Sequence, residues 1–213
     1  MRILALDSSS QVASVAVVEF STGSENLLFE ENTPHARSDS SALFQSLQKA
    51  VSACGTPDAL CVGLGPGSYN GLRASIATAR AMATALERPL HALPSPLSLP
   101  GSEEGCWVVG DARGGHLWVA CVQQGAFLEA PSLIAPRDIS DHLAKRPDMT
   151  VLGPASLAEI PSLRISTPSA AQLARLAHRC DPVYLSDLTP EPLYLKPPHI
   201  TAPKAAAPAA VTR

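Results

Sequence analysis

The sequence predicts an α/β protein with mixed β-sheets, folded as two small domains. Short β-branched or apolar runs open the chain and recur in its middle, and two segments between them change to the apolar spacing of helices. Strands joined by short turns come first, and strand–helix–strand units follow. We therefore expect antiparallel hairpins to precede parallel crossovers within one sheet.

The first three strands are predicted from a meander at the N-terminus. Residues 2–7 (RILALD) end in a carboxylate, residues 12–18 (VASVAVV) form a second run, and a third begins at residues 27–29. The SSS sequence and the polar stretch around Gly23 provide the turns between them.

Two long helices are predicted next. Over residues 38–54 the apolar side chains recur at i, i+4 and i+8, Ser and Asp residues can cap the start, and Gly55 ends the helix. A strand over residues 59–64 leads through the sequence GPGSYNG into a second helix over about residues 70–86, which Pro89 stops. The first half is thus expected to be βββαβα.

The second half is predicted to be smaller and less regular. The proline-rich residues 90–101 are interpreted as a linker, which divides a first domain (1–100) from a second (101–190). A C-terminal segment (191–213) is expected to return to the first domain and to end in a disordered Pro- and Ala-rich tail. The elements expected in the second domain are strands over 107–111 and 117–123 and helices over 138–145 and 170–179.

Composition and charge narrow the function classes. Apolar residues make up 46% of the chain and charged residues 16%, which supports a real core and argues against general disorder. The net charge is −3 and the 16 basic residues form no run. Because phosphate neutralisation supplies much of the affinity for nucleic acid, the chain is not expected to bind RNA tightly by itself.

The cysteines and the absence of targeting signals indicate a reducing compartment. The five cysteines are odd in number and form no CxxC, and two of them lie in strand-like runs, so they are interpreted as buried, reduced thiols. No secretory signal and no apolar run of bilayer length is present in the sequence. We expect a cytoplasmic protein with no membrane contact.

The Gly-rich stretch GLGPGSYNG is the most specific local motif. Gly65, Gly67 and Ser68 lie between a buried strand and a helix, where backbone N–H groups and the helix N-terminus can bind an anion. No GK[ST] follows, so the stretch is not a Walker loop. The other interpretation, a tight turn that needs glycine for its dihedral angles, is favoured by loop composition alone.

Asp7 has two interpretations of equal weight. A carboxylate at the end of a strand often faces the ligand crevice of an open α/β fold. It can equally cap the following turn through Ser9 or Ser10.

The second helix is lined with small residues, which favours close packing against another helix. About half of its surface must pack on its own sheet, and the rest is predicted to bind a partner together with the first helix. Arg73 and Arg80 are seven residues apart and therefore share a helix face. One interpretation is that they position a nucleotide phosphate or partner carboxylates, and the other is that they are solvated surface charges. The predicted partner interface comprises Leu43, Leu47, Arg73, Ala74, Ala77, Thr78, Ala81 and Ala85.

Two pairs of residues further along are interpreted as structural. Asp111 and Arg113 are expected to form an ion pair that stabilises a turn. Trp107 and Trp118 are expected in the core of the second domain.

Four motifs in order along the chain carry a family resemblance. The sequences ILALDSSS, GPGSYNGLRASIATARAMATAL, GDARGGHLWVA and PLYLKPP resemble the TsaB (YeaZ) family, the first two specifically and the last two more weakly. The resemblance implies an actin-like, sugar-kinase-like (ribonuclease H-like) fold. It also implies a part in making threonylcarbamoyladenosine beside the anticodon of tRNA. In that family TsaB pairs with its catalytic paralogue TsaD through a four-helix bundle, and the ATPase TsaE joins the pair.

The resemblance and the residues together predict a subunit without catalytic residues. TsaD binds a metal through two His residues four apart on its first long helix, whereas no two of the six His here have that spacing, and Arg37–Ser41 replaces the family's His-containing context. Serines follow Asp7 where kinases of this fold have glycine. No metal and no cofactor is therefore expected.

Weaker alternatives stay open at this point. Asp7, Gly65, Gly67 and Ser68 form at most a weak site for ADP or ATP that a partner completes. A kinase-like ATPase and a glycoprotease-like hydrolase are the competing enzyme functions. A homodimer in isolation is also expected to be compatible with the apolar helix face, and tRNA is expected to bind only through the complex.

Overall fold

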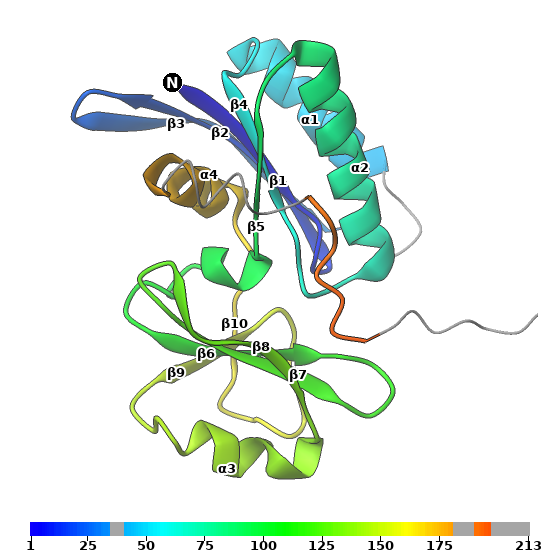
Figure 1. Ribbon diagram of the computed structural model, residues 1–213, viewed down its shortest axis with the longest axis vertical. Coiled ribbons are helices and arrows are strands. Elements are labelled where there is room, and N and C mark those ends of the chain that lie inside the picture. The colour runs from blue at the N-terminus through cyan, green and yellow to red at the C-terminus, as the bar shows by residue number, and fades with distance from the viewer. Residues whose placement is uncertain (35–40, 181–189, 197–213) are drawn as a thin grey trace, which may run out of the picture.

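Two five-stranded sheets, one above the other, form the framework of the computed structural model, which describes residues 1–34, 41–180 and 190–196 (Figure 1). The strands of the first sheet are β1 (Arg2–Asp7), β2 (Val12–Ser21), β3 (Ser24–Pro34), β4 (Ala59–Gly63) and β5 (Leu90–Leu93). The strands of the second are β6 (Cys106–Asp111), β7 (Leu117–Gln123), β8 (Ala126–Ile134), β9 (Thr150–Gly153) and β10 (Arg164–Ile165).

The two sheets have the same strand order. The first runs β3-β2-β1-β4-β5 and the second runs β8-β7-β6-β9-β10. In each, the first three strands are antiparallel, and the last two run parallel to the first. The predicted α/β class with mixed sheets, in which hairpins precede crossovers, is confirmed.

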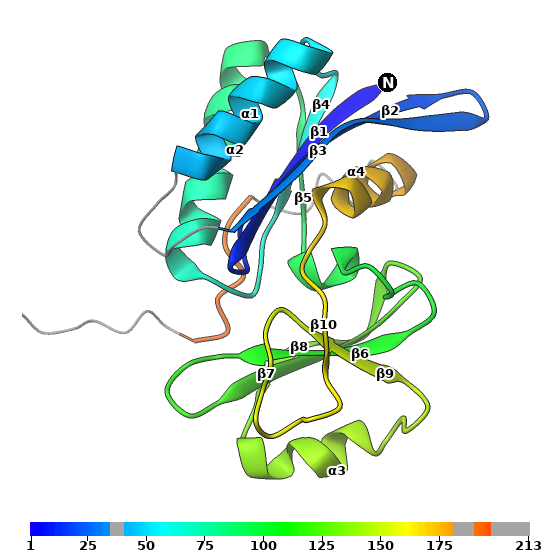
Figure 2. The ribbon, with the colours of Figure 1, turned by 180° about the vertical axis from the view of Figure 1, so that it is seen from behind.

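The helices cover the two sheets unequally. Helices α1 (Ser41–Cys54) and α2 (Tyr69–Leu86) lie side by side on the outer face of the first sheet, whereas α3 (Ile139–Leu143) is a short helix under the second (Figures 1 and 2). Leu43, Leu47 and Ile76 bury the apolar faces of α1 and α2 against β1, β2 and β4. The predicted start of the first helix, residues 38–40, lies outside the described residues.

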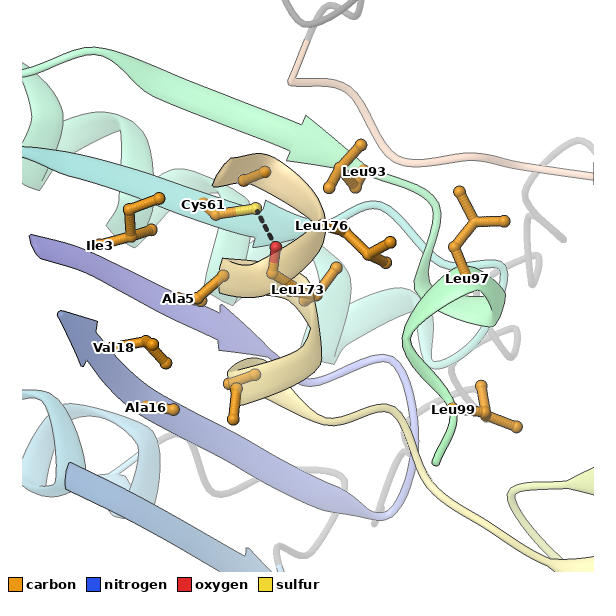
Figure 3. Close-up of a cluster of buried hydrophobic side chains, with 14 of the residues drawn as sticks. Ile3, Ala5, Ala16, Val18, Cys61, Leu93, Leu97, Leu99, Leu173 and Leu176 are labelled. Carbon is orange, nitrogen blue, oxygen red and sulfur yellow. Dashed lines mark hydrogen bonds between the residues drawn. The ribbon is translucent and has the colours of Figure 1, made fainter. Parts of the chain in front are cut away.

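Helix α4 (Ala170–Arg179) packs on the other face of the first sheet, between the two sheets. Leu173 and Leu176 contact the apolar side chains of β1, β2 and β4, and the Cys61 thiol donates to the Leu173 carbonyl oxygen at 3.8 Å (Figure 3). The sequence placed this helix within the second domain, whereas the structure packs it on the first sheet. The domain boundaries themselves stay a prediction.

The interpretation of residues 90–101 as a linker was wrong. Residues 90–93 form β5, which pairs in parallel with β4, and Ser95–Ser98 form a buried 3₁₀ helix. The prolines follow the strand instead of interrupting it, so they do not prevent its ladder from forming. Strands β8, β9 and β10 were not predicted. The helix predicted over residues 138–145 is shorter in the structure, where α3 (Ile139–Leu143) follows a 3₁₀ helix over Pro136–Asp138.

Predictions for the second half are confirmed at the tryptophans and the turn. Trp107 and Trp118 are 1% and 5% exposed and belong to the cores on opposite sides of the second sheet. Arg113 pairs with Asp111 at 3.7 Å, and its backbone N–H donates to that carboxylate at 2.7 Å. This is the predicted turn-stabilising pair.

The five cysteines are free, and three of them are buried. Burial raises the pKa of the Cys106 thiol to about 12 and raises the pKa of Cys61 as well. Cys61, Cys106 and Cys121 are therefore core residues, as predicted, whereas Cys54 and Cys180 are only half-buried. Among the described residues, no helix has the length and hydropathy to cross a membrane.

The segment 190–196 lies against both halves of the chain. The Leu193 N–H donates to the Leu64 carbonyl at 2.8 Å, and Tyr194 stacks on Tyr69 with ring centroids 5.2 Å apart. Lys196 donates to the Arg113 carbonyl at 2.8 Å. The predicted disordered tail, from residue 197 onward, lies outside the described residues.

Candidate functional site

An apolar groove runs between α1 and α2 on the outer side of the first sheet. It encloses about 510 Å³. Its walls are almost wholly carbon, and the side chains that line it are Phe44, Leu47, Gln48, Val51, Ala77, Thr78, Ala81 and Met82. An apolar surface of this kind, set between two long helices, is typical of a protein-binding face.

The helical repeat of α2 explains why the groove lies there. Leu72, Ile76 and Ala79 bury one face of α2 on the sheet, so Ala77 and Ala81 are exposed on the opposite face. Because these side chains are short, a helix from another chain can approach the α2 backbone closely. The Ser68 hydroxyl caps the helix start by accepting from the Gly71 N–H at 3.4 Å.

The predicted interface residues divide between the surface and the core. Arg73, Ala77, Ala81 and Ala85 are exposed, while Ala74 and Thr78 are half-buried. Leu43 and Leu47 are 3% and 4% exposed and belong to the core beneath α1. Leu47 still contributes to the groove floor, but Leu43 is covered by its own sheet.

Phe44, a large apolar side chain that α1 exposes, was not among the predicted interface residues. Phe44 is 51% exposed, and Gln48 and Val51 follow it at one-turn spacing along the groove. The helical spacing of α1 was recognised, but the assignment of its faces requires the strand against which it packs. Helical spacing alone already places Phe44 and Val51 about one turn before and after Leu47, beside the predicted surface.

Asp7 forms a second cluster, at the junction of three loops. Its carboxylate is fully buried and accepts from the Ser9 N–H at 2.7 Å, the Ser9 hydroxyl at 2.6 Å and the Ser95 hydroxyl at 2.6 Å. The Ser95 oxygen in turn accepts from the Gly65 N–H at 2.8 Å. Of the two interpretations of Asp7, the geometry favours the cap of its own turn, extended here to two further loops.

The glycines of the loop allow backbone to approach backbone. A Cβ added at Gly67 would overlap the Ser9 carbonyl oxygen, and one at Gly71 would overlap the Ser8 carbonyl oxygen. The Ser68 N–H, one of the amides predicted to face an anion, donates to the Ser9 carbonyl at 2.6 Å. The structure thus brings Asp7, Gly65, Gly67 and Ser68 together, as a tight internal turn.

Between the Asp7 junction and the second sheet, the described residues leave about 10 Å³ of space. Pro66, Trp118 and Pro168 are among the residues that line this small space. This volume corresponds to about one water molecule and is far smaller than a nucleotide. Within the described ranges, no group of three or more His, Cys, Asp or Glu side chains has the geometry to hold a metal ion.

Residues 32–99 match the family model described as "TsaD: tRNA N6-adenosine threonylcarbamoyltransferase". This range contains both α1 and α2, which form the groove.

Several mycobacterial proteins are similar to most of the chain. The uncharacterized protein Rv3421c of Mycobacterium tuberculosis is 30% identical over 205 residues, which cover 92% of each chain. The uncharacterized protein ML0378 of Mycobacterium leprae is 28% identical over 92% of this chain, which spans only 55% of that longer protein.

Two solved structures share the fold. "YeaZ from Pseudomonas aeruginosa" superposes with a TM-score of 0.68 at 22% identity, covering 91% of this chain and 99% of that one. A protein described as having similarity to peptidase YEAZ from Pseudomonas aeruginosa gives 0.67 at 23% identity, covering 92% and 99%. The predicted α/β fold with mixed sheets is thereby confirmed as the fold of these two proteins. With the near full-length mycobacterial similarity, the family-model match and the four sequence motifs, the chain belongs to the TsaB (YeaZ) family.

Proposed function

We propose that the chain is a non-catalytic subunit that binds a TsaD-like paralogue and is required for threonylcarbamoyladenosine formation in tRNA. The α1–α2 groove carries this proposal, because its apolar side chains remain exposed to solvent among the described residues. Phe44, at 51% exposure, is the anchor expected to insert into the partner. Ala77 and Ala81 let the partner's helices approach, as in the four-helix bundle that the family resemblance implies.

The non-catalytic part of the proposal is supported by the Asp7 junction. A kinase of this fold needs free backbone amides around the phosphates and a carboxylate that faces substrate. Here the Gly65 and Ser68 N–H groups donate to protein oxygens, and the Asp7 carboxylate is buried by its own turn. This arrangement favours a structural role over a kinase-like ATPase.

Nucleotide and tRNA enter the proposal only through the complex. Gly67 is exposed, so any ADP or ATP is proposed to bind beside it, with groups that the partner supplies. The TsaE-like ATPase is proposed to join the pair. The chain's net charge of −3 supports tRNA contact through the assembled complex.

The glycoprotease-like alternative has less support. A metalloprotease needs His or carboxylate side chains gathered at one point, and the described residues contain no such group of three. Proteolysis by the purified chain that a chelator inhibits would favour this alternative over the partner role.

Depletion and complementation test the proposal. Loss of the chain is expected to remove threonylcarbamoyladenosine from tRNA, measured by mass spectrometry of nucleosides, and the wild-type gene should restore it. The chain alone should neither hydrolyse ATP nor modify tRNA. Normal modification in depleted cells, or turnover of ATP by the contaminant-free chain, would contradict the proposed function.

A further inference from the structure

The charged residues of the two helices that form the groove are all of one sign. Neither α1 nor α2 contains an Asp or Glu, although the whole chain has 19 acidic residues and a net charge of −3. The three charged side chains of the pair are all basic: Lys49, Arg73 and Arg80. The surface proposed to bind the partner is therefore positive on a protein that is negative overall.

Two of these three charges have no ionic partner among the described residues. Lys49 is neutralised by Glu31 of β3 at 2.6 Å, whereas Arg73 and Arg80 form no ion pair there. Both arginines are exposed, and their spacing of seven residues places them in one row along α2. The row lies beside Ala77 and Ala81, on the flank of α2 away from α1.

Arg73 is also held in place. Its guanidinium donates to the Tyr69 hydroxyl at 3.0 Å and lies over the Tyr69 ring, 5.3 Å from the centroid. Tyr69 is stacked in turn on Tyr194. A guanidinium fixed by such contacts loses less conformational entropy when it binds a carboxylate.

We propose, on the basis of the partner surface inferred above, that this arginine row selects a partner whose docking helices carry carboxylates and disfavours a second copy of this chain. A two-fold dimer on this face would meet the same two helices, which offer Arg73 and Arg80 no carboxylate. An acidic partner gains ion pairs at the rim of the apolar groove. Charges at the rim govern specificity and salt dependence more than total affinity.

The test is a double charge reversal, Arg73→Glu with Arg80→Glu. Affinity for the TsaD-like paralogue is measured by calorimetry at about 0.1 M and about 1 M salt, where the Debye length falls from about 10 Å to about 3 Å. Wild-type affinity is expected to fall with salt. The double variant is expected to bind about tenfold more weakly at low salt and to bind more tightly as salt rises.

Self-association provides the second readout. Sedimentation of the wild-type chain alone is expected to show weak association that strengthens with salt, because salt screens the repulsion between arginines. Arg137→Glu is the matched control, since Arg137 is 87% exposed in the second half of the chain, and it should leave both measurements unchanged. Arg73→Lys with Arg80→Lys should keep the salt dependence of wild type, because the charge is kept, but lose part of the affinity, because lysine lacks the guanidinium that Tyr69 holds in place.

The two proposals fail separately. Unchanged paralogue affinity and salt dependence in the double charge reversal, with binding abolished by Ala77→Arg, would overturn the selection by arginines alone. Unchanged affinity in both variants would overturn the groove as the partner surface. Tighter self-association of the wild-type chain than pairing with the paralogue would also contradict the selection.

Discussion

The groove between α1 and α2 and the junction around Asp7 both lie on the first sheet. The groove exposes apolar side chains to solvent, whereas the junction is a buried polar cluster whose hydrogen bonds are made to other groups of the same chain. The groove leaves Phe44 51% exposed, and Ala77 and Ala81 are exposed beside it. At the junction, the Asp7 carboxylate accepts three hydrogen bonds, and the neighbouring space holds about 10 Å³. Both regions contain motifs of the family resemblance.

The difference separates a surface made for another molecule from one completed internally. Uncovered apolar area lowers the free energy of a complex when a partner buries it. A carboxylate that already accepts three hydrogen bonds gains little from a ligand and loses much if a donor is removed. Substitutions in the groove should therefore change pairing, and substitutions at the junction should change folding.

The largest expected effect is on pairing. Ala81→Arg places a long charged side chain in the apolar groove, where it keeps the partner's helices from approaching the α2 backbone closely. Affinity for the TsaD-like paralogue should fall about 100-fold or more, measured by calorimetry, with little change in thermal unfolding because Ala81 is exposed. The matched control is Ala144→Arg, at an exposed helix end in the second half. Undiminished binding of Ala81→Arg would contradict this contrast.

Gly71→Ala should reverse the usual sign of a helix substitution. Glycine to alanine within a helix ordinarily stabilises by up to about 1 kcal/mol. At Gly71 the new Cβ would overlap the Ser8 carbonyl oxygen, so we expect a loss of about 2–3 kcal/mol in urea unfolding. Ser52→Ala on the exposed face of α1 is the control and should be neutral or slightly stabilising. A stabilised Gly71→Ala variant would show that the turn is not packed as described.

Asp7→Asn should weaken the fold without weakening pairing. The Asn side chain keeps one acceptor oxygen, but its NH₂ group faces hydroxyls that donate to Asp7 in the wild type. The free energy of unfolding, measured in urea, should therefore fall by about 1–3 kcal/mol. The folded variant should bind the paralogue with wild-type affinity. Reduced affinity at full folding would mean that the junction takes part in binding, and the contrast between the two regions would fail.

Much of the fold could be predicted from the sequence because local patterns determine it. The meander, α1 and α2 follow from the spacing of apolar residues and from turn residues. Strand β5 was missed because its short apolar run stands beside prolines, and only its parallel pairing with β4 identifies it. Helix α4 was recognised, but its amphipathic pattern cannot say which of two sheets it covers.

The sites divide in the same way. Ala77 and Ala81 were found because helical periodicity places them on one face. Ser95 was missed as a partner of Asp7, since 88 residues separate the two and no local pattern connects them. Leu43 was predicted to line the interface together with Leu47, because the two lie four residues apart on one helix face. The structure instead packs Leu43 against the sheet beneath α1.

The smallest expected effect concerns pH and leaves both regions intact. His91 on β5 is half-buried, and this burial lowers its pKa below the usual value. The unfolded chain therefore binds the His91 proton more readily than the folded chain does. The contribution of neutral His91 to the free energy of unfolding is complete above pH about 6.5 and is lost as the pH falls through the folded-state pKa. His91→Gln should flatten the dependence of urea unfolding on pH between about 7 and 5. An identical pH profile would show that His91 is not the titrating group.

Footprinting of side chains with hydroxyl radicals tests the central claim most directly, because it reports the groove and a distant surface in one sample. On addition of the TsaD-like paralogue, oxidation of Phe44 and Met82 in the groove should fall severalfold. Oxidation of Leu128 and Leu133, which are 45% and 39% exposed on the second sheet, should not change. Protection of the second sheet with Phe44 still fully reactive would contradict the account.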